Sequence, residues 1–119
     1  MQLTCEPIPD MPSGLTVRLS GNLEVDGATR LWEELTTGMA KDSRFFIFDL
    51  TDVPIVTSAG IGILVRFLVR LRSSGGAVAI VGCSEKIEEV FSIVMLTEIL
   101  QVCGSEEEAR ERLRTIASG

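Results

Sequence analysis

The chain has 119 residues, of which 45% are hydrophobic, and this length is typical of one domain built around one core. Its net charge of −6 opposes binding to a nucleic-acid phosphate backbone. It contains no histidine, the residue most often used as general base and neutral metal ligand, so the composition disfavours catalysis and a metal site.

Cysteine usage and hydropathy predict a cytoplasmic protein. Cys5, Cys83 and Cys103 are an odd number without a close pair, which fits neither a disulfide framework nor a zinc site. Apolar runs such as residues 61–65 are too short to span a bilayer, and residues 1–5 lack the features of a signal peptide. We therefore expect no membrane association, no cofactor and no metal.

The first third of the sequence predicts a hairpin followed by a helix. Residues 3–8 and 15–19 flank the turn-rich residues 9–14, a pattern typical of a β-hairpin with a wide loop. The period then becomes helical over about residues 26–40. The apolar face of this helix consists of Leu23, Leu31, Leu35 and Met39, with Trp32 on its flank.

The middle of the chain predicts a strand, a helix and a second strand. Residues 45–50 form a nearly continuous apolar run, as expected for a central strand covered on both faces. A helix follows from residues 57–60 and ends at residues 73–76, which contain two glycines. Residues 77–81 form a second short apolar run and predict another buried strand.

The last third predicts two helices and a short strand. Ser84 is placed to cap a third helix whose apolar positions extend to Val94. Residues 99–102 predict a last short strand, and Ser105 precedes a C-terminal helix that reaches about Ile116. The alternation of elements predicts a single α/β domain over residues 1–119, with a mixed sheet of four to five strands and about four helices.

Three strand-to-helix connections are expected to meet at the carboxyl end of the sheet, where functional loops of α/β proteins cluster. They are residues 21–24, 54–60 and 82–84. The middle connection places Ser58 in the first turn of a helix, where free N–H groups and the helix dipole would stabilise a phosphoserine. The alternative is that Ser58 or Thr57 serves only as the N-cap.

Helical periodicity predicts an interaction surface beside Ser58. If the leucines of residues 61–71 face the core, other residues of the helix face outward, with Phe67 at the edge of the outward face. The outward residues are Ala59, Gly62, Ile63, Arg66 and Arg70. The alternative is that another element covers Ile63 and Phe67.

Several motifs together resemble a STAS domain of the anti-sigma factor antagonist type. They are the Gly-Asn-Leu-Glu turn at residues 21–24, the strand ending at residues 48–50, the stretch Val-Thr-Ser-Ala-Gly-Ile-Gly at residues 56–62, and the glycine pair at residues 75–76. In that family the serine at the start of the second helix is phosphorylated by an anti-sigma factor of the serine-kinase type. The resemblance assigns this serine to Ser58.

The resemblance also implies a partner cycle. The unmodified protein binds the anti-sigma factor and so releases a sigma factor. The phosphorylated protein dissociates, and a phosphoserine phosphatase returns it to the unmodified form. Thr57 stands where the family has aspartate, and residues 21–24 replace Gly-Glu-Leu-Asp. The partner-binding residues expected on this basis are Glu24, Thr57, Ala59, Gly60, Gly62, Ile63, Arg66 and Phe67. The alternative function is a STAS scaffold or transport-complex subunit without phosphorylation.

Other chemistries fit less well. Asp49 and Asp52 follow a predicted central strand, as in a phosphate-accepting receiver, but the acidic pair expected after the first strand is missing, so they are interpreted as solvated loop acids or helix-cap partners. Cys83, at a helix start, is interpreted as an inert small residue and not as a reactive thiol. The acidic run of residues 106–108 is interpreted as a solvated helix face.

Overall fold

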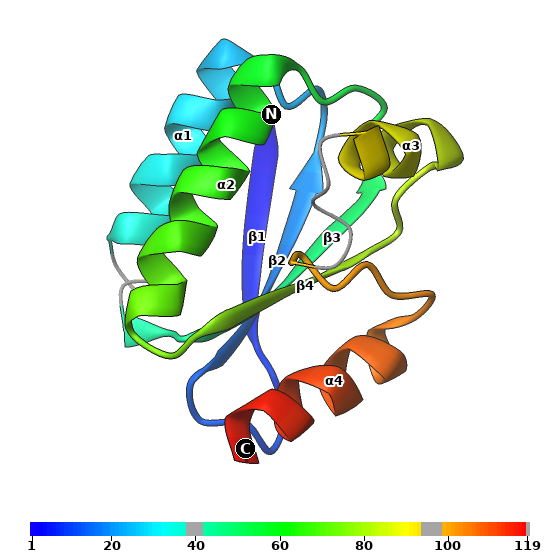
Figure 1. Ribbon diagram of the computed structural model, residues 1–119. Helices are drawn as coiled ribbons and strands as arrows, with labels where there is room; N and C mark the ends of the chain where they lie inside the picture. Colours follow the sequence, from blue (N-terminus) through cyan, green and yellow to red (C-terminus); the bar gives the residue numbers. More distant parts are fainter. Residues whose placement is uncertain (38–41, 94–98, 119) are drawn as a thin grey trace.

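A computed structural model describes residues 1–37, 42–93 and 99–118, which form a single α/β domain with a mixed sheet. The four-stranded sheet has the order β1-β2-β3-β4, and helices lie on both of its faces (Figure 1). Its strands are β1 (Gln2–Pro7), β2 (Gly14–Ser20), β3 (Phe45–Asp52) and β4 (Ala77–Val81). Its helices are α1 (Val25–Thr36), α2 (Ser58–Ser73), α3 (Glu85–Ile93) and α4 (Glu106–Ser118).

The strand pairing follows from the connections. Strands β1 and β2 are antiparallel, with Leu3 opposite Leu19, which confirms the predicted hairpin. Strands β2, β3 and β4 are parallel, and β3 is paired on both sides, with Phe46 between Leu15 and Val78. The carboxyl ends of three strands therefore lie at one edge of the sheet, and the loops that follow them share that edge.

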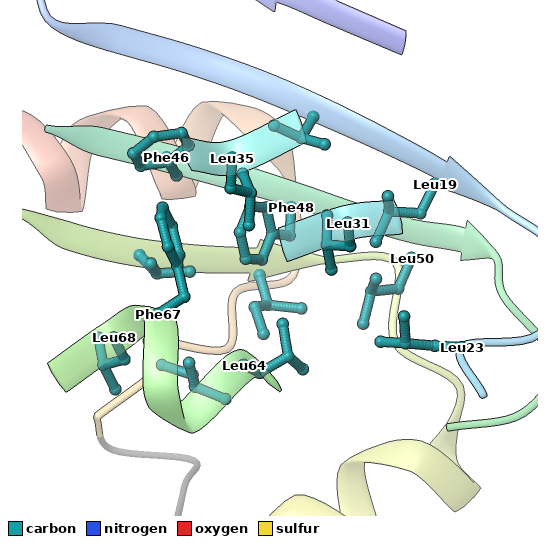
Figure 2. Close-up of a cluster of buried hydrophobic side chains, with 14 of the residues drawn as sticks. Leu19, Leu23, Leu31, Leu35, Phe46, Phe48, Leu50, Leu64, Phe67 and Leu68 are labelled. Carbon is teal, nitrogen blue, oxygen red and sulfur yellow. The ribbon is translucent and has the colours of Figure 1, made fainter. Parts of the chain in front are cut away.

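The larger apolar cluster lies between the sheet and the helices α1 and α2 (Figure 2). Phe67 of α2 meets Phe46 edge-on, with ring centroids 5.0 Å apart, and also contacts Phe48 at 6.1 Å. Leu31 of α1 and Leu64 of α2 are buried in the same cluster. Helix α2 ends where Gly75 adopts a positive φ of 80° and the N–H of the following residue donates to the carbonyl of Leu71.

A smaller apolar cluster lies on the opposite face of the sheet, under α4. Ile47 and Val81 contribute from the strands, and Ala109 and Leu113 contribute from the helix. The alternation of side chains along β3 explains why one apolar strand supplies both clusters. The prediction of a strand covered on both faces is confirmed.

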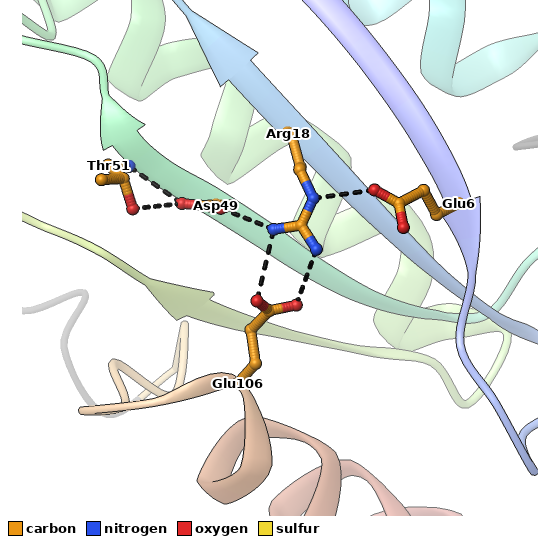
Figure 3. A network of polar contacts seen from close by, with 5 residues as sticks. All are labelled: Glu6, Arg18, Asp49, Thr51 and Glu106. Atoms are coloured by element: carbon orange, nitrogen blue, oxygen red, sulfur yellow. Dashed lines mark hydrogen bonds and ion pairs between the residues drawn. The ribbon is translucent and has the colours of Figure 1, made fainter.

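A polar network occupies the part of this second face that crosses β1, β2 and β3 (Figure 3). The guanidinium of Arg18 donates to Glu6 at 2.8 Å, to Asp49 at 2.7 Å and to Glu106 at 3.0 Å. Asp49 also accepts a hydrogen bond from the N–H of Thr51. The interpretation of Asp49 as a loop acid or cap partner is wrong, because it lies within β3 and binds Arg18. The interpretation of Glu106 as part of a solvated face is also wrong, because this residue of α4 is partly buried and its carboxylate binds Arg18.

The helix starts agree with the sequence, whereas the last predicted strand does not form. Ser84 caps α3, since its Oγ accepts from the N–H of Ile87 at 3.2 Å, and Ser105 caps α4 through the N–H of Glu108 at 3.1 Å. The predicted strand at residues 99–102 is reduced to a bridge between Ile80 and Val102.

Four residues of the predicted helices, Gly38, Met39, Ala40 and Val94, lie outside the described residues. Within the described ranges, no helix is long and apolar enough to cross a membrane.

Candidate functional site

Two of the three expected connections meet through the backbone of Leu23. This residue forms an isolated parallel bridge with Val56, and its N–H donates to the carbonyl of Ile55 at 2.9 Å. Its carbonyl accepts from both the N–H of Thr57, at 3.0 Å, and the Oγ1 of Thr57, at 3.2 Å. The start of α2 is therefore fixed to the loop after β2, and the predicted meeting of these two connections is confirmed.

An open hollow of about 740 Å³ lies where these connections meet. It is lined by Met1, Asn22, Glu24, Val25, Asp26, Gly27, Thr57, Ser58 and Ala59. The third expected connection, residues 82–84, does not line it. Gly82 lies instead against Thr51, where an added Cβ would overlap the Thr51 side chain.

Thr57 and Ser58 have separate functions at the start of α2. Thr57 is the N-cap, with extended backbone, and its Oγ1 accepts a 3.5 Å hydrogen bond from the N–H of Gly60. Ser58 is the first residue of the helix and is exposed. Among the described residues, no group is hydrogen-bonded to its hydroxyl. Of the two alternatives for the cap, the structure assigns it to Thr57, and the Ser58 hydroxyl is left accessible.

The two glycines of the first turns differ in their surroundings. Gly60 is buried, and a Cβ there would lie 2.6 Å from the carbonyl oxygen of Leu23. Gly62 is exposed, and a Cβ there would meet nothing within 4 Å. Gly60 therefore positions the helix start, and Gly62 leaves open surface one turn beyond Ser58.

The hollow is acidic on the side formed by α1. Glu24 is the residue before α1 and Asp26 is in its first turn, and both are exposed. Val25, between them, is 66% exposed and adds an apolar contact point. Of these three residues, only Glu24 was predicted from the sequence. Val25 and Asp26 could have been predicted, because the first turn of α1, like that of α2, begins at the carboxyl edge of the sheet.

The predicted outward face of α2 is only partly correct. Phe67 is 3% exposed and packs between Phe46 and Phe48, so its assignment to a partner surface is wrong. Ile63 is half-buried and packs against the larger apolar cluster. Arg66 is exposed, with its guanidinium 4.8 Å from the centroid of the Trp32 ring.

Cys83 does not have the surroundings of a reactive thiol. Burial, with a smaller contribution from the nearby carboxylate of Glu88, raises the pKa of Cys83 to about 12. A thiol with this pKa is protonated at neutral pH and is a poor nucleophile. The pKa agrees with the interpretation of Cys83 as an inert small residue.

The fold and the helix-start site together define a known class of domain. The model of the STAS domain family matches residues 6–109, and the chain belongs to this family. A Thermotoga maritima protein assigned as an anti-sigma factor antagonist is 37% identical over 65 residues, which cover 55% of this chain and 58% of that protein. BtrV of Bordetella bronchiseptica, with the same assignment, is 28% identical over 115 residues and 97% of each chain.

A solved structure shows the same fold. The anti-sigma factor antagonist SpoIIAA of Bacillus, in its unphosphorylated form, superposes with a TM-score of 0.74 at 18% identity, over 95% of this chain and 98% of that chain. The structure of SpoIIAA in its phosphorylated form gives a TM-score of 0.71 at 19% identity, over 93% and 98%.

Proposed function

We propose that this chain is a phosphorylation-switched protein-binding module, an anti-sigma factor antagonist. In its unmodified form it binds an anti-sigma factor of the serine-kinase type and so releases a sigma factor. A phosphoserine phosphatase returns it to the binding form. The proposal makes it a regulatory binding protein of the cytoplasm and not an enzyme. Its relatives with this assignment and its family support the general function.

The observation that carries the switch is the exposed hydroxyl of Ser58 at the N-terminus of α2, which no group within the described ranges engages in a hydrogen bond. Because Thr57 already caps the helix, the Ser58 hydroxyl is accessible to a kinase without loss of the cap. A phosphate there would add about −1.5 to −2 charges next to free N–H groups of the first turn, which stabilise an anion. The fold would therefore tolerate the modification.

The same charge would oppose a docked partner. Glu24 and Asp26 line the hollow with Ser58, so phosphorylation would make an already acidic surface more acidic. A partner surface that covers Ser58 would have to desolvate this phosphate without an added cation. The remaining surface residues proposed for partner contact are Thr57, Ala59, Gly62, Ile63 and Arg66, around or beside the hollow.

Two serine variants test the switch against the alternative of an unphosphorylated STAS scaffold. Each anti-sigma factor kinase of the same organism is incubated with the chain and ATP, and phosphate on the Ser58 peptide is measured by mass spectrometry.

The affinity of each variant for the kinase is measured as well. We expect Ser58→Ala to bind the kinase and to resist modification, and Ser58→Asp to bind the kinase about tenfold more weakly or worse. Thr57→Ala is the control for capping and should cost about 1 kcal/mol of stability. Equal affinity of the Ser58→Asp protein and the unmodified protein would favour the scaffold.

A further inference from the structure

Helix α2 carries a charge opposite to that of the remaining chain. It contains Arg66, Arg70 and Arg72 and no acidic residue. The whole chain has a net charge of −6, so the residues outside α2 have a net charge of −9. Three exposed cations within two helical turns form a local basic surface on an acidic protein.

The arginines of α2 are available for an external partner. In the described part of the chain, no carboxylate lies within 4.0 Å of their guanidinium groups, whereas Arg18 and Arg112 are paired with carboxylates. The guanidinium groups of Arg66 and Arg70 lie over the ring of Trp32 from α1, at 4.8 and 5.9 Å from its centroid. Stacking on an aromatic ring reduces the conformational freedom that binding would otherwise remove.

An exposed apolar side chain lies within this basic surface. Val69 is 65% exposed and lies one turn from Arg66 and from Arg72 along the helix. Cations around one apolar residue form a combination typical of a protein interface, in which a hydrophobic contact is surrounded by polar ones. We call Arg66, Val69, Arg70 and Arg72 the arginine face.

We propose that the arginine face is a second recognition surface, which binds an acidic segment on the anti-sigma factor. This inference rests on the proposed function for the identity of the partner. Guanidinium groups bind carboxylates in a bidentate geometry, so acidic side chains are the matching chemistry. The net charge of −9 outside α2 repels an extended polyanion, and this favours a compact acidic protein surface over a membrane or a nucleic acid.

The distances allow one partner to cover both surfaces. Arg66 lies eight residues after Ser58 and Arg72 lies fourteen after it, which corresponds to about 12 and 21 Å along the helix axis. A partner that buries about 800 Å² of this chain would extend over such a length. The acidic hollow at one end and the arginine face at the other would fix the orientation of the partner on α2.

A matched pair of double variants tests the proposal. Arg66→Gln/Arg70→Gln removes two charges from the arginine face, and Arg110→Gln/Arg114→Gln removes two from α4, which packs on the other face of the sheet. With the anti-sigma factor that binds the unmodified chain, we expect the first variant to raise the Kd about tenfold and to reduce its salt dependence. The control should change the Kd less than about twofold. Arg66→Lys/Arg70→Lys keeps the charge and should lose less affinity than the glutamine variant.

The outcomes separate failure of this inference from failure of the proposed function. Unchanged affinity of a folded Arg66→Gln/Arg70→Gln protein, together with weakened binding by Ser58→Asp, would overturn the inference alone. If the chain binds no anti-sigma factor, the proposed function fails, and a short polyglutamate peptide becomes the probe in an NMR titration. Shifts of the Trp32 indole and of residues 62–73 that the glutamine variant abolishes would still support an acidic partner. Shifts spread over the whole chain, binding to phosphatidylglycerol vesicles, or self-association through α2 would contradict recognition of an acidic protein segment by the arginine face.

Discussion

Gly60 and Gly62 lie two residues apart in α2 and predict opposite effects of the same substitution. In Gly60→Ala the new Cβ would lie 2.6 Å from the carbonyl oxygen of Leu23 and 2.7 Å from its Cγ. The backbone cannot yield without moving the helix start, so we expect a loss of about 1–3 kcal/mol in the free energy of unfolding. In Gly62→Ala the Cβ meets nothing within 4 Å, and higher helix propensity should stabilise by up to about 1 kcal/mol.

Urea unfolding of both variants measures this difference. Gly60→Ala should also weaken partner binding, because the Leu23 carbonyl that it displaces accepts two hydrogen bonds from Thr57. Similar stability changes in the two variants would contradict the contact between Gly60 and Leu23.

At the residue scale, the sequence predicted the site but not the function of each side chain. Thr57 and Ser58 are both residue types that favour the N-cap position. Which of them caps α2 depends on whether the helix starts one residue earlier or later, and periodicity does not locate a helix start that finely. Phe67 lies at the edge of the predicted outward face, and it is buried because β3 supplies Phe46 and Phe48 from more than fifteen residues away in the chain. Its burial depends on a long-range contact that a local pattern does not contain.

At the element scale, the Arg18 network connects β1, β2, β3 and α4 and makes stability depend on pH. Burial by itself would raise the pKa of Asp49, but hydrogen bonds from Thr51 and Arg18 outweigh it and lower the pKa below its usual value. Hydrogen bonds to Glu106, Glu6 and Asp49 raise the pKa of Arg18, which stays charged. A carboxyl whose pKa is lower in the folded state stabilises the fold above its unfolded pKa, near 4 for aspartate, and loses this contribution as pH falls through the folded value.

We therefore expect the free energy of unfolding to decrease as pH falls below about 4, and Asp49→Asn to remove part of this decrease. Thermal unfolding between neutral and acidic pH measures it. Asp52→Asn is the control, because Asp52 is exposed at the end of β3 and its side chain makes none of the network contacts. Parallel pH profiles for Asp49→Asn and the unmodified chain would contradict the contribution of Asp49.

Elements with a clear period were predicted well, and those defined by distant contacts were not. The hairpin, the strands β3 and β4, and the starts of α2, α3 and α4 follow from alternation, apolar runs, helical spacing and capping residues. Residues 99–102 have the apolar composition of a strand, yet they pair with β4 only at one bridge, between Ile80 and Val102. The Arg18 network could not be predicted from local sequence patterns, because its members are separated by up to a hundred residues in the chain. They are Glu6, Arg18, Asp49 and Glu106.

At the scale of the whole molecule, the sheet separates two helical layers of unequal size (Figure 1). Side chains of α1, α2 and α3 join the larger apolar cluster, whereas α4 buries Ala109 and Leu113 in the smaller one. The order of elements predicts an α/β fold with a largely parallel sheet, but it does not say which face each helix covers. Because buried apolar contacts determine the free energy of local opening, α4 should open more readily than the central strands.

Native-state hydrogen exchange measures this local opening of α4, in which the ion pair of Glu106 takes part. Glu106 binds Arg18 of β2 at 3.0 Å, whereas Glu107, next to it in the first turn of α4, is exposed and makes no contact with the network. Both carboxylates lie in the first turn, where each complements the helix dipole, and only Glu106 also binds the sheet. We expect Glu106→Gln to lower the free energy of opening of the α4 amides by about 0.5–1 kcal/mol more than Glu107→Gln does, with β3 unaffected. Equal exchange of the α4 amides in the two variants would show that Ala109 and Leu113 hold the helix without the ion pair.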